Sequence, residues 1–111
     1  MKVYPYTSVP AETYAGMEGI SIRWAIGENV GAPNFVLRVI ELEKGAATAY
    51  HQHDWEHEVF VLAGTGDAHD ADGTTPIEPG SCVYVAPNEK HQFINRGETP
   101  LRFICVIPNP K

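Results

Sequence analysis

Residues 45–66, GAATAYHQHDWEHEVFVLAGTG, decide how this chain is organised. His51 and His53 are two residues apart, so in an extended segment both imidazoles point to the same face of a sheet. His57 follows just before the apolar run VFVL, and a turn in between brings it back beside the first pair. Three neutral nitrogen donors then converge, and imidazole is the commonest protein ligand of first-row transition metals. We predict a metal site here; a fourth histidine, His91, stands ahead of another strand-like segment.

The length and composition indicate one all-β domain. With 111 residues, the chain is long enough for one buried core and too short for a second, cofactor-binding domain, so we expect a single domain over residues 1–111. Its 10 Gly and 9 Pro indicate many turns. The net charge is −6 and the 8 Lys and Arg residues are scattered, which makes nucleic acid an unsuitable partner. No apolar run reaches the length of a membrane span and residues 1–10 lack a signal-peptide pattern, so we expect a cytoplasmic protein without membrane contact.

Apolar runs at regular turn spacing predict the strands. In residues 19–26 the alternation places the three isoleucines and Trp24 on one apolar face, whereas residues 34–42 are apolar enough for a strand buried on both faces. Short strands at this spacing, with no stretch that requires a helix, predict an antiparallel sandwich or barrel. The expected strands are residues 19–26, 34–42, 57–63, 68–72, 82–85, 92–95 and 101–107.

Three further segments carry expectations. Residues 1–17 read as an N-terminal arm that either wraps around its own domain or docks on the other subunit of a homodimer. Cys82 and Cys105 each lie inside an apolar run, so we predict two buried free thiols. His69 lies near the Asp72-Gly73 hairpin turn, where we expect a solvated side chain.

The histidine spacing resembles the first motif of the cupin superfamily, G-x5-H-x-H-x3,4-E-x6-G. Gly45, His51 and His53 match its opening. At the acidic position the chain departs from the pattern, because His57 has the three-residue spacing and Glu58 the four-residue spacing. Neighbours on a strand face opposite sides, so only one of the two can point to the metal.

A second cupin motif, G-x5-P-x-G-x2-H-x3-N, is framed by Gly80, His91 and Asn95. Ala86 occupies the proline place and Asn88 the second glycine place. The resemblance covers roughly residues 34–108.

With the runs APNFVLR, WEHEVFVL and APNEKH, the chain looks like the small single-domain manganese cupins that hold their metal with four histidines. The resemblance implies a small antiparallel β-barrel of the jelly-roll or double-stranded β-helix type. It assigns His51, His53, His57 and His91 as metal ligands and leaves Glu58 on the outer face. Ligand softness alone favours iron, cobalt, nickel, copper or zinc over manganese, whereas the resemblance indicates manganese. We follow the resemblance and place manganese first and iron second.

Four uncharged ligands leave the ion its full +2 charge, which favours anionic or enolisable small molecules. We predict an oxidative, dioxygenase-like metalloenzyme; the alternatives are a Lewis-acid isomerase or lyase and a non-catalytic module that binds a small anion. The sequence supplies no convincing nucleophile or proton-transfer pair. Arg38 either packs its stem with its head at the rim or anchors an anion in the pocket. The other expected pocket residues are Phe103, Cys105, Trp55 and Tyr84.

Overall fold

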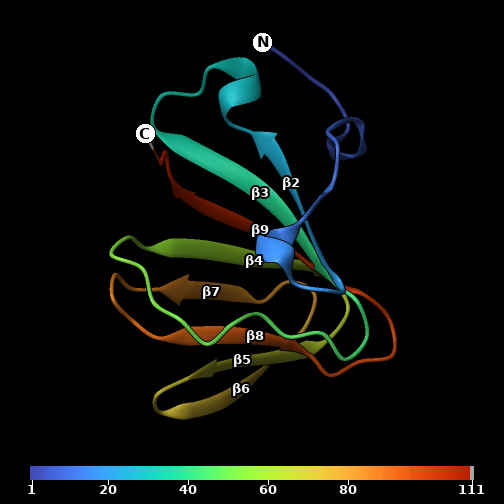
Figure 1. Ribbon diagram of the computed structural model, residues 1–111, viewed down its shortest axis with the longest axis vertical. Coiled ribbons are helices and arrows are strands. Elements are labelled where there is room, and N and C mark those ends of the chain that lie inside the picture. The colour runs from blue at the N-terminus through green and yellow to red at the C-terminus, as the bar shows by residue number, and fades with distance from the viewer. Residues whose placement is uncertain (111) are drawn as a thin grey trace.

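The computed structural model describes residues 1–110, which form two antiparallel sheets (Figure 1). The larger sheet has the order β1-β2-β3-β9-β4-β7 and the smaller one the order β6-β5-β8. This arrangement confirms the predicted all-β jelly roll. The strands are β1 (Glu12–Thr13), β2 (Ile20–Ile26), β3 (Phe35–Leu42), β4 (His57–Ala63), β5 (Gly66–Asp70), β6 (Gly73–Ile77), β7 (Cys82–Val85), β8 (His91–Asn95) and β9 (Leu101–Pro108). The 3-10 turns are η1 (Tyr6–Ser8), η2 (Tyr14–Gly16) and η3 (Glu28–Val30).

The segment before the first histidines extends the smaller sheet. Single β-bridges join Ala47 to Ile94 and His51 to His91, so residues 46–51 run antiparallel beside β8. The Thr48 amide donates to the carbonyl of Phe93 at 2.9 Å, and the Thr48 hydroxyl accepts from the Phe93 amide at 2.8 Å. This pairing fixes the segment that carries His51 against the strand that begins at His91.

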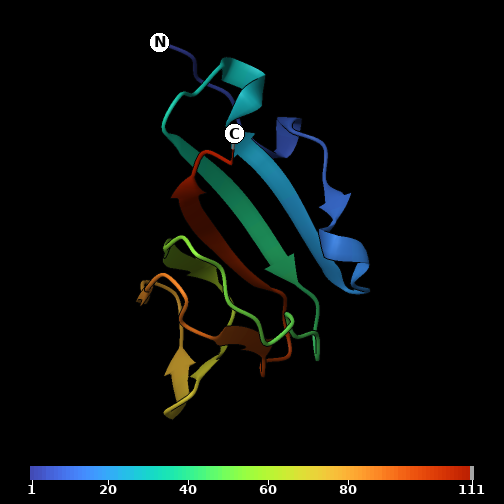
Figure 2. The same ribbon diagram turned by 60° about the vertical axis from the view of Figure 1, so that its left-hand side comes forward.

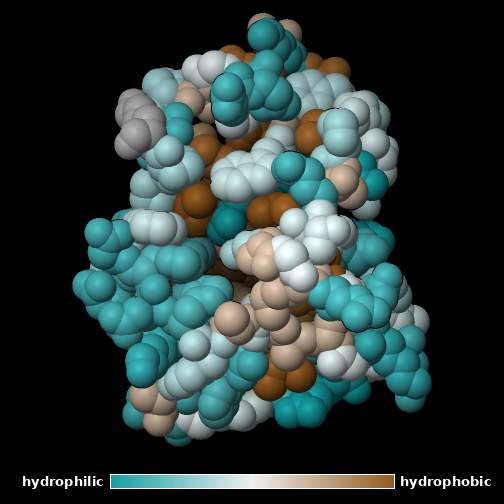
Figure 3. All heavy atoms as spheres, in the orientation of Figure 1, coloured by the Kyte–Doolittle hydropathy of each residue, from teal (hydrophilic) through white to brown (hydrophobic). Residues whose placement is uncertain are grey.

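The hydrophobic core lies between the two sheets. From Leu101 to Ile107, strand β9 alternates between buried and half-buried residues, as expected for a central strand with one face on the core. In Figure 3, hydrophobic residues lie recessed in the middle of this side of the molecule, behind hydrophilic ones. The largest fully buried side chains are Phe103, Leu42, Leu101 and Val61.

A β-bulge changes the apolar face of β2. The register with β3 shifts between Trp24 and Ile26, so Ala25 is the extra residue on the bulged strand. Beyond the bulge the side-chain alternation is reversed: Ala25 is buried and Ile26 is exposed. The predicted single face with all three isoleucines and Trp24 is therefore wrong in its second half. Strand β3 is also less buried than expected, because Phe35 is exposed.

The N-terminal arm packs along the β2 edge of its own domain (Figure 2). The Tyr4 hydroxyl donates to the carbonyl of Ala25 at 2.6 Å, and Arg23 donates to the carbonyls of Thr7 and Val9. Within residues 1–110 there is no helix with the length and apolarity needed to cross a membrane.

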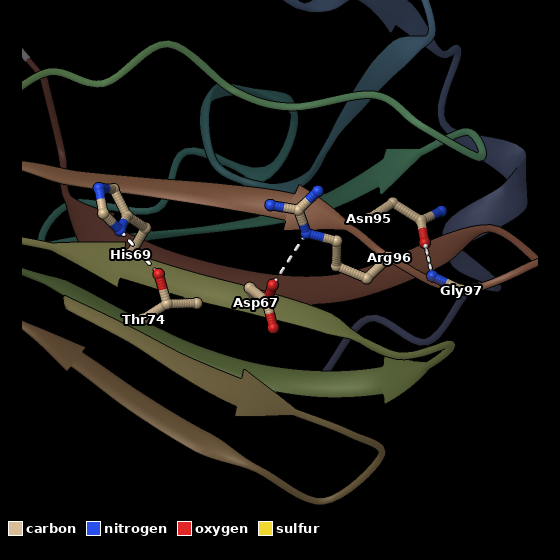
Figure 4. A network of polar contacts seen from close by, with 6 residues as sticks. All are labelled: Asp67, His69, Thr74, Asn95, Arg96 and Gly97. Atoms are coloured by element: carbon tan, nitrogen blue, oxygen red, sulfur yellow. Dashed lines mark hydrogen bonds and ion pairs between the residues drawn. The ribbon is translucent and has the colours of Figure 1, made fainter.

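Two side chains depart from the sequence expectations. Cys82 is exposed on β7, whereas Cys105 is buried as predicted; both thiols are free. His69 lies within β5 rather than at the hairpin tip and is half-buried. Its Nδ1 lies 2.9 Å from the hydroxyl of Thr74 on the neighbouring strand (Figure 4). His69 is therefore held by a hydrogen bond across the hairpin.

Candidate metal centre

His51 and His91 face each other across the pairing of residues 46–51 with β8. The His91 amide donates to the His51 carbonyl at 2.9 Å, and the His51 amide donates back at 3.2 Å. The His91 Nδ1 lies 3.0 Å from the carbonyl oxygen of Glu89. A carbonyl can only accept, so Nδ1 is the donor of this bond, and in the neutral ring Nε2 is the nitrogen that can act as a ligand. This tautomer suits a metal ligand.

His53 is held by the loop that precedes β8. The Asn88 amide donates to the His53 carbonyl at 2.6 Å, and Asn88 has a positive φ of 65°. Asparagine tolerates this left-handed conformation better than most residues, which explains how it replaces the glycine of the second motif. The Trp55 ring stacks on the His53 ring, with centroids 4.5 Å apart and an interplanar angle of 7°.

His57 opens β4 in the larger sheet and is buried, with 5% of its surface exposed. Glu58 is exposed and lies on the opposite face of the strand. The two residues therefore face opposite sides, as the strand period predicts. The histidine, and not the glutamate, points into the molecule.

The structure brings the four histidines together. The ring centroids are 4.6 Å apart for His51 and His53, 5.0 Å for His51 and His91, 5.3 Å for His53 and His57, 6.0 Å for His53 and His91, and 4.8 Å for His57 and His91. Imidazoles that share one ion have centroids roughly 3.2 Å from it and hence roughly 4.5 to 6.4 Å from one another. The spacing of the rings therefore fits a shared ion.

The donor atoms themselves are not yet in a coordinating arrangement. Within residues 1–110 no three His, Cys, Asp or Glu side chains have the geometry of a metal site. Binding of an ion would therefore require the imidazole side chains to rearrange. His57 Nδ1 is buried without a hydrogen-bond partner, as expected for a ring whose nitrogen lacks its ligand.

The local electrostatics favour the neutral form of His51, His53 and His57. Burial, followed by the neighbouring His91 and Arg38, lowers the pKa of His57 from 6.5 to about 3. The pKa values of His51 and His53 are also lowered, chiefly by burial and then by the neighbouring histidines. A neutral imidazole is the form that binds a metal, so the three rings are ready to donate at neutral pH.

Arg38 points into the same cavity from β3. Its surface is 6% exposed, its Nη2 donates to the Cys105 thiol at 2.9 Å, and its guanidinium lies 5.6 Å from the centroid of the Trp24 ring. Burial raises the pKa of Cys105, although Arg38 opposes this effect. The sequence left open whether the Arg38 guanidinium lies at the rim or inside the pocket. In the structure it is buried.

Three of the expected pocket residues line the cavity with His51, His57 and His91. They are Arg38, Phe103 and Cys105, and the cavity has a volume of about 20 Å³, enough for an ion or one water molecule. Trp55 joins the cluster through its contact with His53. Tyr84 does not, because its side chain is on the outer face of β7 and 63% exposed. It lines a separate hollow of about 420 Å³ that also touches His91.

Further lining residues were missed by the sequence analysis: Tyr14, Ile40, Thr48 and Phe93. Phe93 is two residues from His91, and Ile40 is two residues from Arg38. The two-residue period of a strand therefore predicts that each pair faces the same side, so both residues could have been expected in the cavity. Thr48 and Tyr14 reach the cavity from irregular segments, for which no periodic pattern exists.

The chain belongs to the cupin family, because residues 38–107 match the family described as Cupin domain. It is 33% identical over 69 residues to an oxalate-binding protein of Thermotoga maritima. The aligned region covers 61% of this chain and 57% of that protein. It is 40% identical over 53 residues to an (R)-mandelonitrile lyase of Granulicella tundricola, which covers 47% of this chain and 40% of that enzyme. The chain thus aligns with about half the length of these relatives.

Solved structures agree with this assignment. The polyketide cyclase RemF from Streptomyces resistomycificus superposes with a TM-score of 0.90 and 32% identity, covering 97% of this chain and 79% of that one. A sugar phosphate isomerase of the cupin superfamily from Silicibacter pomeroyi superposes with a TM-score of 0.83 and 26% identity, covering 97% and 76%. Related cupins therefore carry names from several reaction classes.

Proposed function

We propose that this chain is a metal-dependent cupin enzyme in which His51, His53, His57 and His91 hold one divalent ion. The observation that carries the proposal is the gathering of four imidazoles with ring centroids 4.6 to 6.0 Å apart, three of which line one cavity. We place manganese first and iron second, following the resemblance to four-histidine cupins. The donor set leaves zinc, nickel, copper and cobalt open.

The reaction that we place first is non-oxidative and acts on a small anionic or enolisable molecule. A bound ion would act as a Lewis acid that polarises a substrate oxygen. The chain orients His91 through the carbonyl of Glu89 and shields the cavity with Phe103. The support for this choice comes from relatives named as a cyclase and a lyase.

Oxidative, dioxygenase-like turnover is our second candidate. Its support is the resemblance to manganese cupins and the small number of protein ligands, which leaves positions for dioxygen and substrate. A non-catalytic anion-binding module is the third candidate, supported by the name of the oxalate-binding relative.

The metal site is tested by elemental analysis of protein purified without a histidine tag. We expect about one equivalent of metal per chain, and His57→Ala should lose most of it. Glu58→Ala is the matched control, because it changes the neighbouring residue on the outer face. Loss of metal in Glu58→Ala together with retention in His57→Ala would refute the ligand assignment.

The reaction class is tested with protein reconstituted separately with Zn, Mn and Fe. Substrates are a panel of enols, phenols, hydroxynitriles and short dicarboxylates, followed by both product formation and oxygen uptake. Turnover with Zn and without oxygen uptake supports the Lewis-acid reaction. Oxygen uptake with Mn or Fe alone supports the oxidative one, and anion binding without turnover under any metal supports the binding module.

We also propose that the protein forms a homodimer. The support is the exposed apolar surface beside edge strand β7, where Phe60 is 44% exposed and lies near Tyr84. Light scattering at micromolar concentration tests this proposal, and a monomer would refute it.

A further inference from the structure

The unsatisfied polar atoms of this structure cluster at one place. Within residues 1–110, three buried side-chain nitrogens lack a hydrogen-bond partner: Arg38 Nε, Trp55 Nε1 and His57 Nδ1. Arg38 and His57 line the same cavity, and Trp55 stacks on His53. Arg38 Nε and Trp55 Nε1 can only donate, so these buried groups call for a ligand that accepts hydrogen bonds.

Arg38 is also a buried charge without a counter-ion. None of the three ion pairs within residues 1–110 involves Arg38; its one hydrogen-bond partner there is the Cys105 thiol. A buried charge is costly unless an opposite charge or strong hydrogen bonds compensate it. The guanidinium is nevertheless held in place, between the Cys105 sulfur and the ring of Trp24. A fixed, uncompensated guanidinium beside a metal site is suited to receive an anion.

We propose that Arg38 is the residue that selects an oxyanion, such as a carboxylate, as the metal-binding end of the substrate. This inference rests on the metal site proposed above. Four neutral imidazoles, a divalent ion and the Arg38 guanidinium would give the cavity a charge of about +3, within a chain whose net charge is −6. A carboxylate can place one oxygen at the ion and still accept from Arg38.

The dimensions of the cavity restrict how such a ligand enters. A volume of about 20 Å³ holds an ion or a water molecule but no complete organic molecule. Once an ion fills this space, a ligand can contact the ion only through one or two of its oxygen atoms, while the rest of the ligand stays outside the cavity. Trp24, whose ring covers the Arg38 guanidinium, is 36% exposed and belongs to a separate hollow beside the N-terminal arm.

The test measures oxalate binding to the Mn-loaded chain by isothermal titration calorimetry. Oxalate is the probe because it can chelate a metal and retain further oxygen acceptors. Arg38→Met keeps a long apolar side chain but removes the charge and all donors, and we expect it to weaken oxalate binding roughly 10- to 100-fold. Arg38→Lys should restore part of the affinity, because it returns the charge without the planar fork.

The matched control is Arg102→Met, because Arg102 lies on the adjacent strand β9 and forms an ion pair with Glu41 away from the cavity. Its oxalate affinity should stay within twofold of that of the unaltered protein. Metal content is measured for every variant, and circular dichroism checks that each one folds. If Arg38→Met folds, binds one Mn and retains full oxalate affinity, the inference alone is refuted. If the unaltered chain holds no metal, the proposed function and this inference fail together.

Discussion

The lowered pKa of His57 makes the metal-free protein sensitive to acid. The pKa is about 3 in the folded protein and 6.5 in the unfolded chain, so the unfolded chain binds the extra proton between these values. Stability is therefore fully present above pH 6.5 and is lost as the pH falls towards 3. At pH 5, one and a half pKa units below 6.5, the loss due to His57 alone is about 2 kcal/mol. His51 and His53 act in the same direction.

Urea denaturation of the chelator-treated protein at pH 7.5 and pH 5.0 measures this effect. The free energy of unfolding should drop by at least 2 kcal/mol between the two conditions. In His57→Gln the drop should be about 2 kcal/mol smaller, because the titrating ring is gone. His69→Gln is the control, since His69 lies outside the histidine cluster and bonds to Thr74. An unchanged pH dependence in His57→Gln would show that His57 is protonated in the folded protein, contrary to our reasoning.

Three further predictions concern the frame of the site. Asn95→Asp replaces a buried amide that donates to two backbone carbonyls, at 3.0 and 2.9 Å, and should lower the free energy of unfolding by about 3 kcal/mol. The control Asn34→Asp changes an exposed residue and should alter the free energy of unfolding by less than about 0.5 kcal/mol. Phe103→Ala removes a fully buried ring and should cost about 3 to 5 kcal/mol in the same urea titration, and a cost below about 1 kcal/mol would contradict the packing described. Gly66→Ala would place a Cβ 2.3 Å from a backbone oxygen of β8. The midpoint of thermal unfolding of this variant should therefore fall well below that of the unaltered protein. An unchanged midpoint would contradict the close approach of the two strands.

The sequence predicted most of the strands because they follow the simple two-residue period. The same period placed His51 and His53 on one face, whereas the expectation that all four histidines meet came from the resemblance to the cupins. His57 and Glu58 are the clearest case: their opposite orientation followed from adjacency on a strand, and the structure has it. The bulge at Ala25 could not be predicted, because a single extra residue leaves no mark in a run of apolar and small side chains.

Strand β7 shows where the period is insufficient. Its sequence CVYV is apolar on both faces, so alternation groups Cys82 with Tyr84 but does not say which pair faces inward. Both were placed inside, and both are exposed. The position of the Arg38 guanidinium could not be predicted either, because apolar residues flank Arg38 on both sides in the sequence. Its burial is visible only from the contacts with Cys105 and Trp24.

The distribution of the histidines over the two sheets has a consequence for folding. His57 belongs to the larger sheet, whereas His91 and the segment that carries His51 belong to the smaller one. An ion held by these residues would therefore act as a cross-link between the sheets, as a disulfide does, and would close the chain between positions 57 and 91. A cross-link of this kind destabilises the unfolded chain by restricting its conformations. Metal uptake should then raise the free energy of unfolding, so that occupancy of the site and the stability of the fold are coupled.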